Sequence, residues 1–295
     1  MTNYLNICIP SYKRAGVVTI FNCIPKSFRE NVFLYVRKEE YEEYSALYAD
    51  RCTIVPIEGV TNIGETRQKI VEHQKGNLIL MIDDDLSLHD AYVNESGMLR
   101  ARPSISEDSF YKLMEYIDEL CGVGFLHGGF LFAAFPRTPV EYPYRVNSAS
   151  ACAVYLDLRS LPLELVDYRD WPVSEDAFVW LNLISHGYDF AKISKWMLKQ
   201  PKAKPNTKLA QGGCWDTRNA ENIATTQQRL LTLFPDYFRV MPMQRDPIHY
   251  GDGSVEHTKQ QRVSVSKRKH VERMKKINPN YTWGVVHRPE YPPPK

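Results

Sequence analysis

The feature that most constrains the fold is a run of five apolar residues that leads directly into three carboxylates. The apolar run is Leu78 to Ile82, and Asp83, Asp84 and Asp85 follow it without a break. Such a run is typical of a strand that is buried on both faces in a parallel sheet. Because unpaired buried charge is very costly, the three acids must lie where the strand ends and water or a cation takes over.

The end of this strand is therefore a candidate metal–phosphate site. Ligands bind at the carboxyl ends of strands in open α/β sheets. Clustered carboxylates repel one another, and a hard cation such as Mg²⁺ or Mn²⁺ that carries a phosphate relieves the repulsion. A single Asp here would indicate no more than an acidic turn, whereas three of them favour the metal site.

The composition fits one large α/β domain, or one domain with an extension. The chain has 295 residues, of which 43% are hydrophobic and 24% are charged, so a sizeable core can form. Its six Cys contain no CxxC pair, and several of them lie in strand-like runs. This pattern favours a reducing compartment over a zinc ribbon or a disulfide framework. No signal peptide or membrane-spanning stretch is visible, so we expect a soluble, cytoplasmic protein that does not bind membranes.

Strands and helices alternate in the first third of the chain. Strands are expected at Leu5–Ile9, Asn31–Val36, Cys52–Ile57 and Leu78–Ile82, and helices near Val17–Asn22 and at Lys38–Ala49 and Thr61–Gln74. This spacing predicts βαβ units and a mainly parallel sheet of the size of a nucleotide-binding half.

The pattern is less regular after the acidic turn. Helices are expected at Ser106–Cys121, Ser174–His186 and Asp216–Phe234, strands at Ala149–Leu158 and Tyr188–Ile193, and a hairpin or two short strands at Val123–Phe135. The expected N-caps are Ser106, Ser174, and either Thr61 or Asn62. Periodicity fades from Pro235 onward. We therefore expect a domain at 1–234, with a nucleotide-binding half at 1–90 and an acceptor half at 91–234, and a C-terminal extension at 235–295.

Three motifs, in their order and spacing, resemble the GT-A glycosyltransferases. The first motif is a strand that ends in Ile9-Pro10-Ser11-Tyr12-Lys13-Arg14. The second is a helix with Asn62-Ile63-Gly64-Glu65-Thr66-Arg67, which precedes the strand that ends in Asp83-Asp84-Asp85. The third is Trp171-Pro172-Val173-Ser174-Glu175-Asp176, which is similar to the "ED" element of that fold. Within the fold, the chain looks most like the phage-type glycosyltransferases, associated with TET/JBP oxygenases, that decorate hydroxymethylated DNA bases.

The resemblance implies a Rossmann-like, mainly parallel sheet flanked by helices, a nucleotide-sugar donor, usually a UDP-sugar, and Mn²⁺ or Mg²⁺. Asp83 and Asp85 match the outer acids of the DxD motif. Asp85 would bind the metal, Asp83 would face the ribose or the metal, and Asp84 between them would belong to the donor site. The cation would neutralise the charge that builds up on the departing nucleoside diphosphate.

Other matched positions would contact the donor. Pro10, Tyr12 and Arg14 match residues that line the base and ribose, and Tyr12 either stacks on uracil or packs at the sheet edge. Gly64 lies in the first turn of a helix, where Gly costs about 1 kcal/mol relative to Ala, and close approach of a ligand would explain it. Arg67 either pairs with donor phosphate or with Asp83, or is a solvated helix charge.

Two acids at the start of a later helix are the candidate catalytic residues. Acids in a first helical turn often serve only the helix dipole. By match to the "ED" element, Asp176, or else Glu175, would accept the proton of the acceptor hydroxyl as a general base. A retaining enzyme needs no such base, and the pair would then bind the acceptor or support the metal.

Three further features stay open at this point. His127 either lies near the sugar or is a core histidine. The glycine-rich segment Gln211–Trp215 is either a lid over the donor or an ordinary connection. His249 and His257 are candidates for an additional metal ligand.

The C-terminal region is strongly basic. Between Lys259 and Lys276 there are eight Lys or Arg residues and one acid, Glu272, whereas the whole chain carries a net charge of only +2. Such a stretch, with Tyr281 and Trp283 close by, indicates a polyanion partner; the alternative is a solvated basic helix. The expected nucleic-acid-binding residues are Lys267, Arg268, Lys269, Arg273, Lys275 and Lys276.

These features together predict a metal-dependent glycosyltransferase that moves a sugar from a UDP-sugar to a hydroxyl on a modified pyrimidine in DNA. The enzyme would reach the base by flipping it out of the duplex or by widening the groove. Its rivals are a transferase of the same fold that acts on protein or polysaccharide, a nucleotidyltransferase, and a nucleic-acid-binding protein on an inactive scaffold. The basic loop that a nucleotidyltransferase needs is poorly matched by residues 11–16. The sugar, the acceptor base, the stereochemistry and the oligomeric state stay open.

Overall fold

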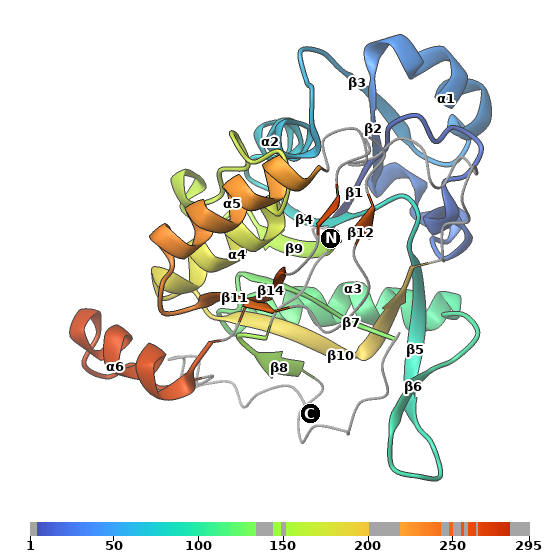
Figure 1. Ribbon diagram of the computed structural model, residues 1–295. Coiled ribbons are helices and arrows are strands. Elements are labelled where there is room, and N and C mark those ends of the chain that lie inside the picture. Colours follow the sequence, from blue (N-terminus) through green and yellow to red (C-terminus); the bar gives the residue numbers. More distant parts are fainter. Residues whose placement is uncertain are drawn as a thin grey trace.

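Four parallel strands form one end of a ten-stranded sheet. They are β1 (Asn6–Pro10), β2 (Val32–Arg37), β3 (Thr53–Ile57) and β4 (Leu78–Ile82), in the spatial order β3-β2-β1-β4. The computed structural model in Figure 1 describes residues 5–133, 144–148, 152–200, 219–242, 248–249, 255–256, 259–263 and 265–283. The parallel βαβ arrangement predicted for the start of the chain is confirmed.

The rest of the sheet is mixed. From β4 it continues through β9 (Ala153–Asp157), β7 (His127–Phe132), β10 (Phe190–Lys199), β5 (Ser87–Val93) and β6 (Leu99–Ala101), and β8 (Tyr144–Val146) also pairs with β10. Strands β7 and β10 are parallel, whereas β9 is antiparallel to both β4 and β7. The acidic turn therefore lies where the last strand of the parallel half meets an antiparallel neighbour, and the Asp83 amide donates to the Cys152 carbonyl of that neighbouring segment at 3.0 Å.

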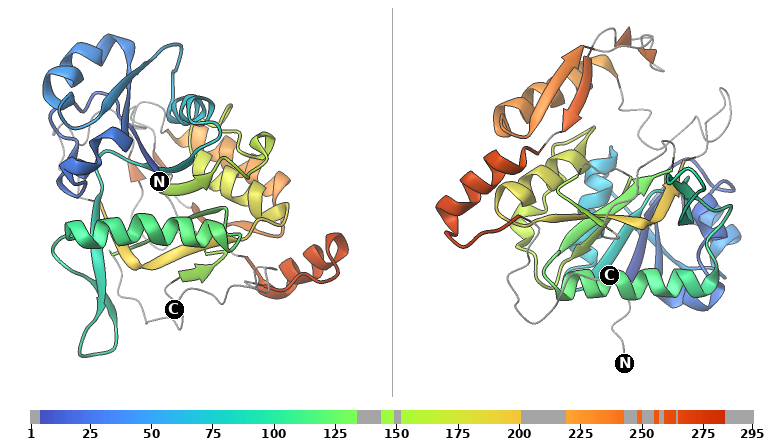
Figure 2. Two further views of the ribbon diagram at one scale, coloured as in Figure 1. Left: turned by 180° about the vertical axis from the view of Figure 1, so that it is seen from behind. Right: turned by 90° about the horizontal axis from the view of Figure 1, so that it is seen from below.

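Helices cover both faces of the sheet (Figures 1 and 2). The α-helices are α1 (Tyr41–Tyr48), α2 (Ile63–His73), α3 (Glu107–Gly122), α4 (Glu175–Ser185), α5 (Ala220–Leu233) and α6 (Lys267–Ile277). The 3₁₀ turns are η1 (Thr19–Asn22), η2 (Lys26–Asn31), η3 (Lys38–Glu40) and η4 (Leu163–Leu165). Two small sheets pair β11 (Phe238–Pro242) with β14 (Lys259–Val263) and β12 (Ile248–His249) with β13 (Val255–Glu256). In the described part of the chain, no helix is both long and apolar enough to cross a membrane.

Strand β4 joins the two halves of the core. Leu78, Leu80 and Ile82 pack into the cluster that contains α3, and Ile79 and Met81 pack into the cluster that contains α2 and α4. Because successive side chains of a strand point to opposite faces, a strand buried on both faces must be apolar at every position. This confirms the interpretation of the apolar run.

Several predicted elements differ from those observed. Residues 17–22 form only the 3₁₀ turn η1, and the described residues 123–133 contain one strand, β7, where a hairpin or two short strands were expected. The side chain of Ser174 does not cap α4, since Ser174 adopts the left-handed conformation with φ +58°. By contrast, Asn62 and Ser106 cap α2 and α3 as expected, with hydrogen bonds of 3.0 and 3.2 Å from the Glu65 and Ser109 amides. The β5–β6 hairpin was not predicted, and α6 was expected only in the alternative interpretation of the basic stretch as a solvated helix.

The structure explains the glycine at position 64 by close packing, without a ligand. A Cβ at this position would lie 2.5 Å from the carbonyl oxygens of both Tyr168 and Trp171. The segment before α4 therefore packs directly on the first turn of α2. Close packing of two backbone segments is sufficient to explain this glycine, and the contact with a ligand stays a prediction.

The substitution Gly64→Ala is expected to destabilise the protein by about 1–3 kcal/mol, because the added methyl group has no room between two backbone segments. The matched control is Gly122→Ala at the end of α3, where a Cβ meets nothing within 4 Å. Urea unfolding followed by circular dichroism measures both effects. Equal stability of the two variants would contradict the packing argument.

Candidate active site

The three acids after β4 have different partners. Asp84 is buried and accepts hydrogen bonds from Arg14 Nη1, at 2.8 Å, and from the Ser11 hydroxyl. Ser11 and Arg14 belong to the loop after β1, and Arg14 Nη1 also lies 3.2 Å from Asp85 Oδ2. Asp84 therefore fixes this loop against the end of β4. The predicted donor residues Asp84 and Arg14 contact each other inside the protein.

Arg67 connects three elements at this site. It is 3% exposed, so it is not a solvated helix charge. Its Nη2 lies 2.9 Å from Asp83 Oδ1 and its Nε lies 3.3 Å from Glu175 Oε1. The guanidinium thereby joins α2 to the end of β4 and to the first turn of α4. The predicted pairing of Arg67 with Asp83 is present, and the pairing with Glu175 was not foreseen.

The site carries more negative than positive charge. Burial raises the pKa of Asp83 to about 6; Arg67 opposes the rise, and Asp85 and Asp84 add to it. Burial also raises the pKa of Glu175, again against the effect of Arg67. Burial opposes the charge on Arg67, but its acidic neighbours outweigh this and raise its pKa. Two guanidiniums stand among five carboxylates, those of Asp83, Asp84, Asp85, Glu175 and Asp176, so a cation would relieve the excess.

Asp85 and Asp83 fit a divalent cation. Asp85 Oδ1 is buried and accepts no hydrogen bond from the described residues, while Oδ2 accepts from Gln200 Nε2 at 3.3 Å. Among the three acids the Asp83 side chain is the most exposed, at 25%. The described ranges contain no group of three or more His, Cys, Asp or Glu side chains that could hold a metal ion without further ligands. Mg²⁺ or Mn²⁺ needs only one or two carboxylates when phosphate and water complete its shell.

The loop after β1 places an aromatic ring at the edge of the parallel half. The guanidinium of Arg37 lies over the Tyr12 ring at 3.6 Å from its centroid, and Arg37 Nη2 donates to the Thr61 carbonyl at 3.2 Å. Arg37 covers one ring face of the half-buried Tyr12, which leaves at most one face for stacking on a base. Pro10, the last residue of β1, is buried. Arg37 was not predicted as a site residue. It is the last residue of β2, so the rule that ligands bind at the carboxyl ends of strands could have identified it, as it identified the acids.

His127 is a core residue. Its side chain is fully buried, Nε2 donates to the Tyr188 carbonyl at 2.8 Å, and burial lowers its pKa to about 4. His127 lines a cavity of about 20 Å³ together with Arg67, Asp176 and Trp180. A cavity of this size holds one water molecule. The predicted base Asp176 thus lies half-buried beside Arg67.

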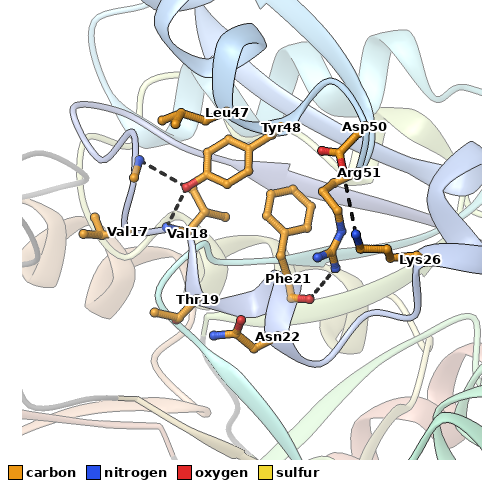
Figure 3. A pocket seen from close by; sticks show the side chains of 11 residues that line it. Val17, Val18, Thr19, Phe21, Asn22, Lys26, Leu47, Tyr48, Asp50 and Arg51 are labelled. Atoms are coloured by element: carbon orange, nitrogen blue, oxygen red, sulfur yellow. Dashed lines mark hydrogen bonds and ion pairs between the residues drawn. The ribbon is translucent and has the colours of Figure 1, made fainter.

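A larger surface pocket is lined by none of the three acids (Figure 3), although Thr19 in its wall donates its amide hydrogen to the Asp84 carbonyl at 2.8 Å. Its volume is about 420 Å³, and its walls come from residues 16–22 and from the end of α1 with the residues after it. The Tyr48 hydroxyl accepts from the Gly16 amide at 3.1 Å, and Arg51 Nη2 donates to the Phe21 and Ile24 carbonyls at 2.6 and 3.0 Å. These contacts brace the loop after β1, and none of the predicted donor residues lines the pocket.

The remaining predicted residues are distributed as follows. The six basic residues expected to bind nucleic acid all lie on α6, at the end of the molecule away from β1–β3 and α1 (Figures 1 and 2). His249 lies in β12. His257 and the segment Gln211–Trp215 lie outside the described residues.

Comparisons with known proteins agree with the predicted resemblance. No family model matches the chain. Two curated relatives, the beta-glucosyl-HMC-alpha-glucosyl-transferases of enterobacteria phages T6 and T2, are 28% and 27% identical over 239 residues. The match covers 80% of this chain and 83% of each relative. The resemblance to phage glycosyltransferases is confirmed by these relatives.

Solved structures were also compared. TarS of S. aureus in complex with UDP-GlcNAc has a TM-score of 0.45 and 12% identity, over 77% of this chain and 66% of that one. Glucosyl-3-phosphoglycerate synthase from Mycobacterium tuberculosis, with Mn²⁺, UDP and glucosyl-3-phosphoglycerate, has a TM-score of 0.43 and 9% identity, over 90% and 88% of the two chains.

The raised pKa of Asp83 leads to a pH-dependent effect on stability. A carboxyl whose pKa is about 6 in the folded state, above its ordinary value of 3.8, stabilises the fold while it is protonated. This contribution is lost as the pH rises through about 6. Asp83→Asn keeps the side chain neutral, so its melting temperature relative to the wild type should be more favourable at pH 7.5 than at pH 4.5. Thermal unfolding in EDTA measures this difference.

The control for this experiment is Asp50→Asn, since the Asp50 side chain is 69% exposed. Its effect on the melting temperature is expected to change less between the two pH values. The same pH dependence in both variants would contradict the assignment to the acid cluster.

Proposed function

We propose that this protein is a metal-dependent glucosyltransferase that moves glucose from UDP-glucose to a glucosylated hydroxymethylcytosine in phage DNA, in the cytoplasm of the host cell. The observation that carries the proposal is the similarity to the two phage transferases over 80% of the chain. A continuous match of this length necessarily contains the middle of the chain, and with it α2, β4 and α4. The acid cluster and Arg67 therefore lie within the shared region.

The acids have separate roles in this proposal. Asp85 and Asp83 would hold Mn²⁺ or Mg²⁺ through oxygen atoms that are accessible or that accept no hydrogen bond from the described residues. The bound cation would neutralise the charge that develops on the departing diphosphate. Asp84 holds the loop after β1 through Arg14 and Ser11. Pro10 at the end of β1 and Tyr12 on that loop line the base and ribose of the donor.

Arg67 and Glu175 position the acids of the site. The Arg67 guanidinium fixes Asp83 and keeps Glu175 buried. A carboxylate in this position is held by an internal cation and does not face an acceptor hydroxyl. Glu175 is therefore a positioning residue, and Asp176 beside it is the acid that contacts the acceptor sugar.

The names of the relatives suggest the stereochemistry. They describe the transfer of an α-glucosyl group to a β-glucosyl-HMC. The glucose of UDP-glucose is α-linked, so an α-linked product means that the configuration is retained. A retaining reaction needs no general base on the acceptor hydroxyl, which agrees with the internal pairing of Glu175.

The acceptor hydroxyl then belongs to a sugar, and not to the hydroxymethyl group expected from the sequence. Substituents at position 5 of a pyrimidine project into the major groove. A glucose in that position is reachable from outside the duplex, so neither the base flipping nor the groove widening expected from the sequence is required.

The test of this function is transfer to defined DNA. The protein is incubated with UDP-glucose, Mn²⁺ and duplexes that contain cytosine, hydroxymethylcytosine or β-glucosyl-hydroxymethylcytosine, and the nucleosides are analysed by mass spectrometry. One added hexose on the third duplex alone is the expected result. Addition to hydroxymethylcytosine alone would overturn the acceptor, and transfer to a protein or polysaccharide without any reaction on DNA would overturn the function.

Replacement of the proposed metal ligand should abolish transfer without unfolding the protein. Asp85→Asn removes the charge that holds the cation, and we expect kcat/KM to fall by about a hundredfold or more, the size of loss seen for one electrostatic contact in the transition state. The rise in melting temperature caused by UDP with Mn²⁺ should disappear as well.

Asp118→Asn on α3 is the control, since that side chain is 59% exposed and distant in sequence from the site. It is expected to keep both the activity and the thermal shift. Wild-type activity in Asp85→Asn would show that the metal site lies elsewhere.

A further inference from the structure

Helix α6 is held in place by a buried polar network. His270, which is fully buried, accepts from the Tyr237 hydroxyl at Nδ1 and donates from Nε2 to the Tyr281 hydroxyl, both at 2.9 Å. The Tyr281 hydroxyl in turn donates to the Asp189 carboxylate at 2.7 Å. Met274, one turn after His270, is 2% exposed and packs at Gly187. The helix is therefore fixed to the turn between α4 and β10.

The rest of the surface of α6 is exposed and basic. Six Lys or Arg side chains project from this helix, with Glu272 as its one acid. The ion pairs that do form are long and exposed: Arg268 with Glu272 at 3.7 Å, and Lys269 with Asp236 at 3.9 Å. The described residues provide no ionic partner for the other three lysines, which are Lys267, Lys275 and Lys276.

The stability of the helix does not explain this charge. Like charges at positions i and i+4, such as Lys269 and Arg273, destabilise a helix. A helix of 11 residues is also marginal by itself in water. The buried contacts of His270 and Met274 thus hold together a set of charges that repel one another. A polyanion bound on the exposed face would remove that repulsion.

We propose that the exposed face of α6 is a docking surface for the phosphate backbone of duplex DNA. The inference rests on the proposed function, since DNA carries the acceptor. Duplex DNA has one negative charge for about every 1.7 Å of its axis, and α6 extends about 16 Å. Lys and Arg on this face can therefore reach several phosphates. Phosphate contacts position a protein without reading the sequence.

The position of α6 indicates which part of the DNA this surface would contact. In all views α6 lies at the end of the molecule away from β1–β3 and α1 (Figures 1 and 2). The acid cluster follows β4, which is next to β1 in the sheet. DNA that presents its modified base at the acid cluster would meet α6 along the flanking duplex. The basic helix then adds affinity at a distance from the reacting sugar.

The first test removes three charges from α6. The variant Lys267→Gln/Lys275→Gln/Lys276→Gln is titrated against a labelled duplex without donor, by fluorescence anisotropy at several salt concentrations. We expect at least a tenfold weaker affinity, and a slope of log K against log salt that is less steep by about 0.9 for each phosphate that the variant no longer neutralises. Unchanged affinity, or an affinity for RNA or for an acidic polypeptide above that for DNA, would overturn the proposal.

The matched control makes the same change in net charge elsewhere. Lys26→Gln/Lys75→Gln/Lys112→Gln removes three exposed lysines from η2, the end of α2 and α3. This variant is expected to bind DNA within about twofold of the wild type, an expectation that follows from the short range of screened charges. An equal loss in both variants would mean that total charge matters and that α6 is not a defined surface.

The second test keeps every charge and loosens the helix. Tyr281→Phe removes the hydroxyl that bridges His270 and Asp189. If α6 must be rigid to dock, DNA affinity falls although all six cations remain. Wild-type affinity in this variant would contradict a rigid docking surface and would mean that α6 binds DNA as a mobile charged segment. The thermal shift with UDP and Mn²⁺ reports that each variant is folded.

These results separate the inference from the proposed function. Loss of DNA affinity in the α6 variants, together with no glucosylation of any DNA by the wild type, would refute the function and retain the docking surface. Glucosylation of DNA by the wild type, with unchanged DNA affinity in the α6 variants, would refute the docking surface and retain the function.

Discussion

The site depends on one buried guanidinium. Arg67 lies between Asp83 and Glu175 and is itself almost inaccessible to solvent. Without it, the buried Glu175 carboxylate and the partly exposed Asp83 carboxylate would lose their cationic partner, which is destabilising. With it, the ends of β4 and α2 and the start of α4 are held together. Gly64 contributes to the same junction, because only a glycine lets the segment before α4 lie on α2.

A second guanidinium, that of Arg14, gives the three acids different roles. Arg14 and Ser11 occupy Asp84, so the middle acid holds the loop after β1 and is not available to a ligand. Asp85 keeps one buried oxygen to which no described residue donates, and Asp83 is partly exposed. The protein thus compensates part of its clustered negative charge internally. The remaining negative charge would attract a divalent cation, and the cation in turn can bind a diphosphate.

The two proposed binding surfaces are opposite in charge and lie in different parts of the molecule. The acid cluster attracts a cation at the edge between the parallel and the mixed parts of the sheet. In the proposal, helix α6 binds DNA phosphates from a position fixed by His270 and Met274. Separation of the two keeps the basic surface from neutralising the acids, so both can act on one long substrate.

The sequence determined those features that depend on local pattern: the buried strand β4, the parallel half, the acids at its end, and the concentration of charge in α6. An apolar run or a charge count is a property of neighbouring residues, so it can be interpreted without a fold. Tertiary structure alone decided that Arg67 pairs with Glu175, that Gly64 faces a backbone and that His270 docks through Tyr281 and Asp189. These partners come from separate elements, and packing of the sheet and its helices brings them together. The β5–β6 hairpin was missed for a related reason, since its burial follows its neighbours β10 and α3 and leaves only weak alternation in the sequence.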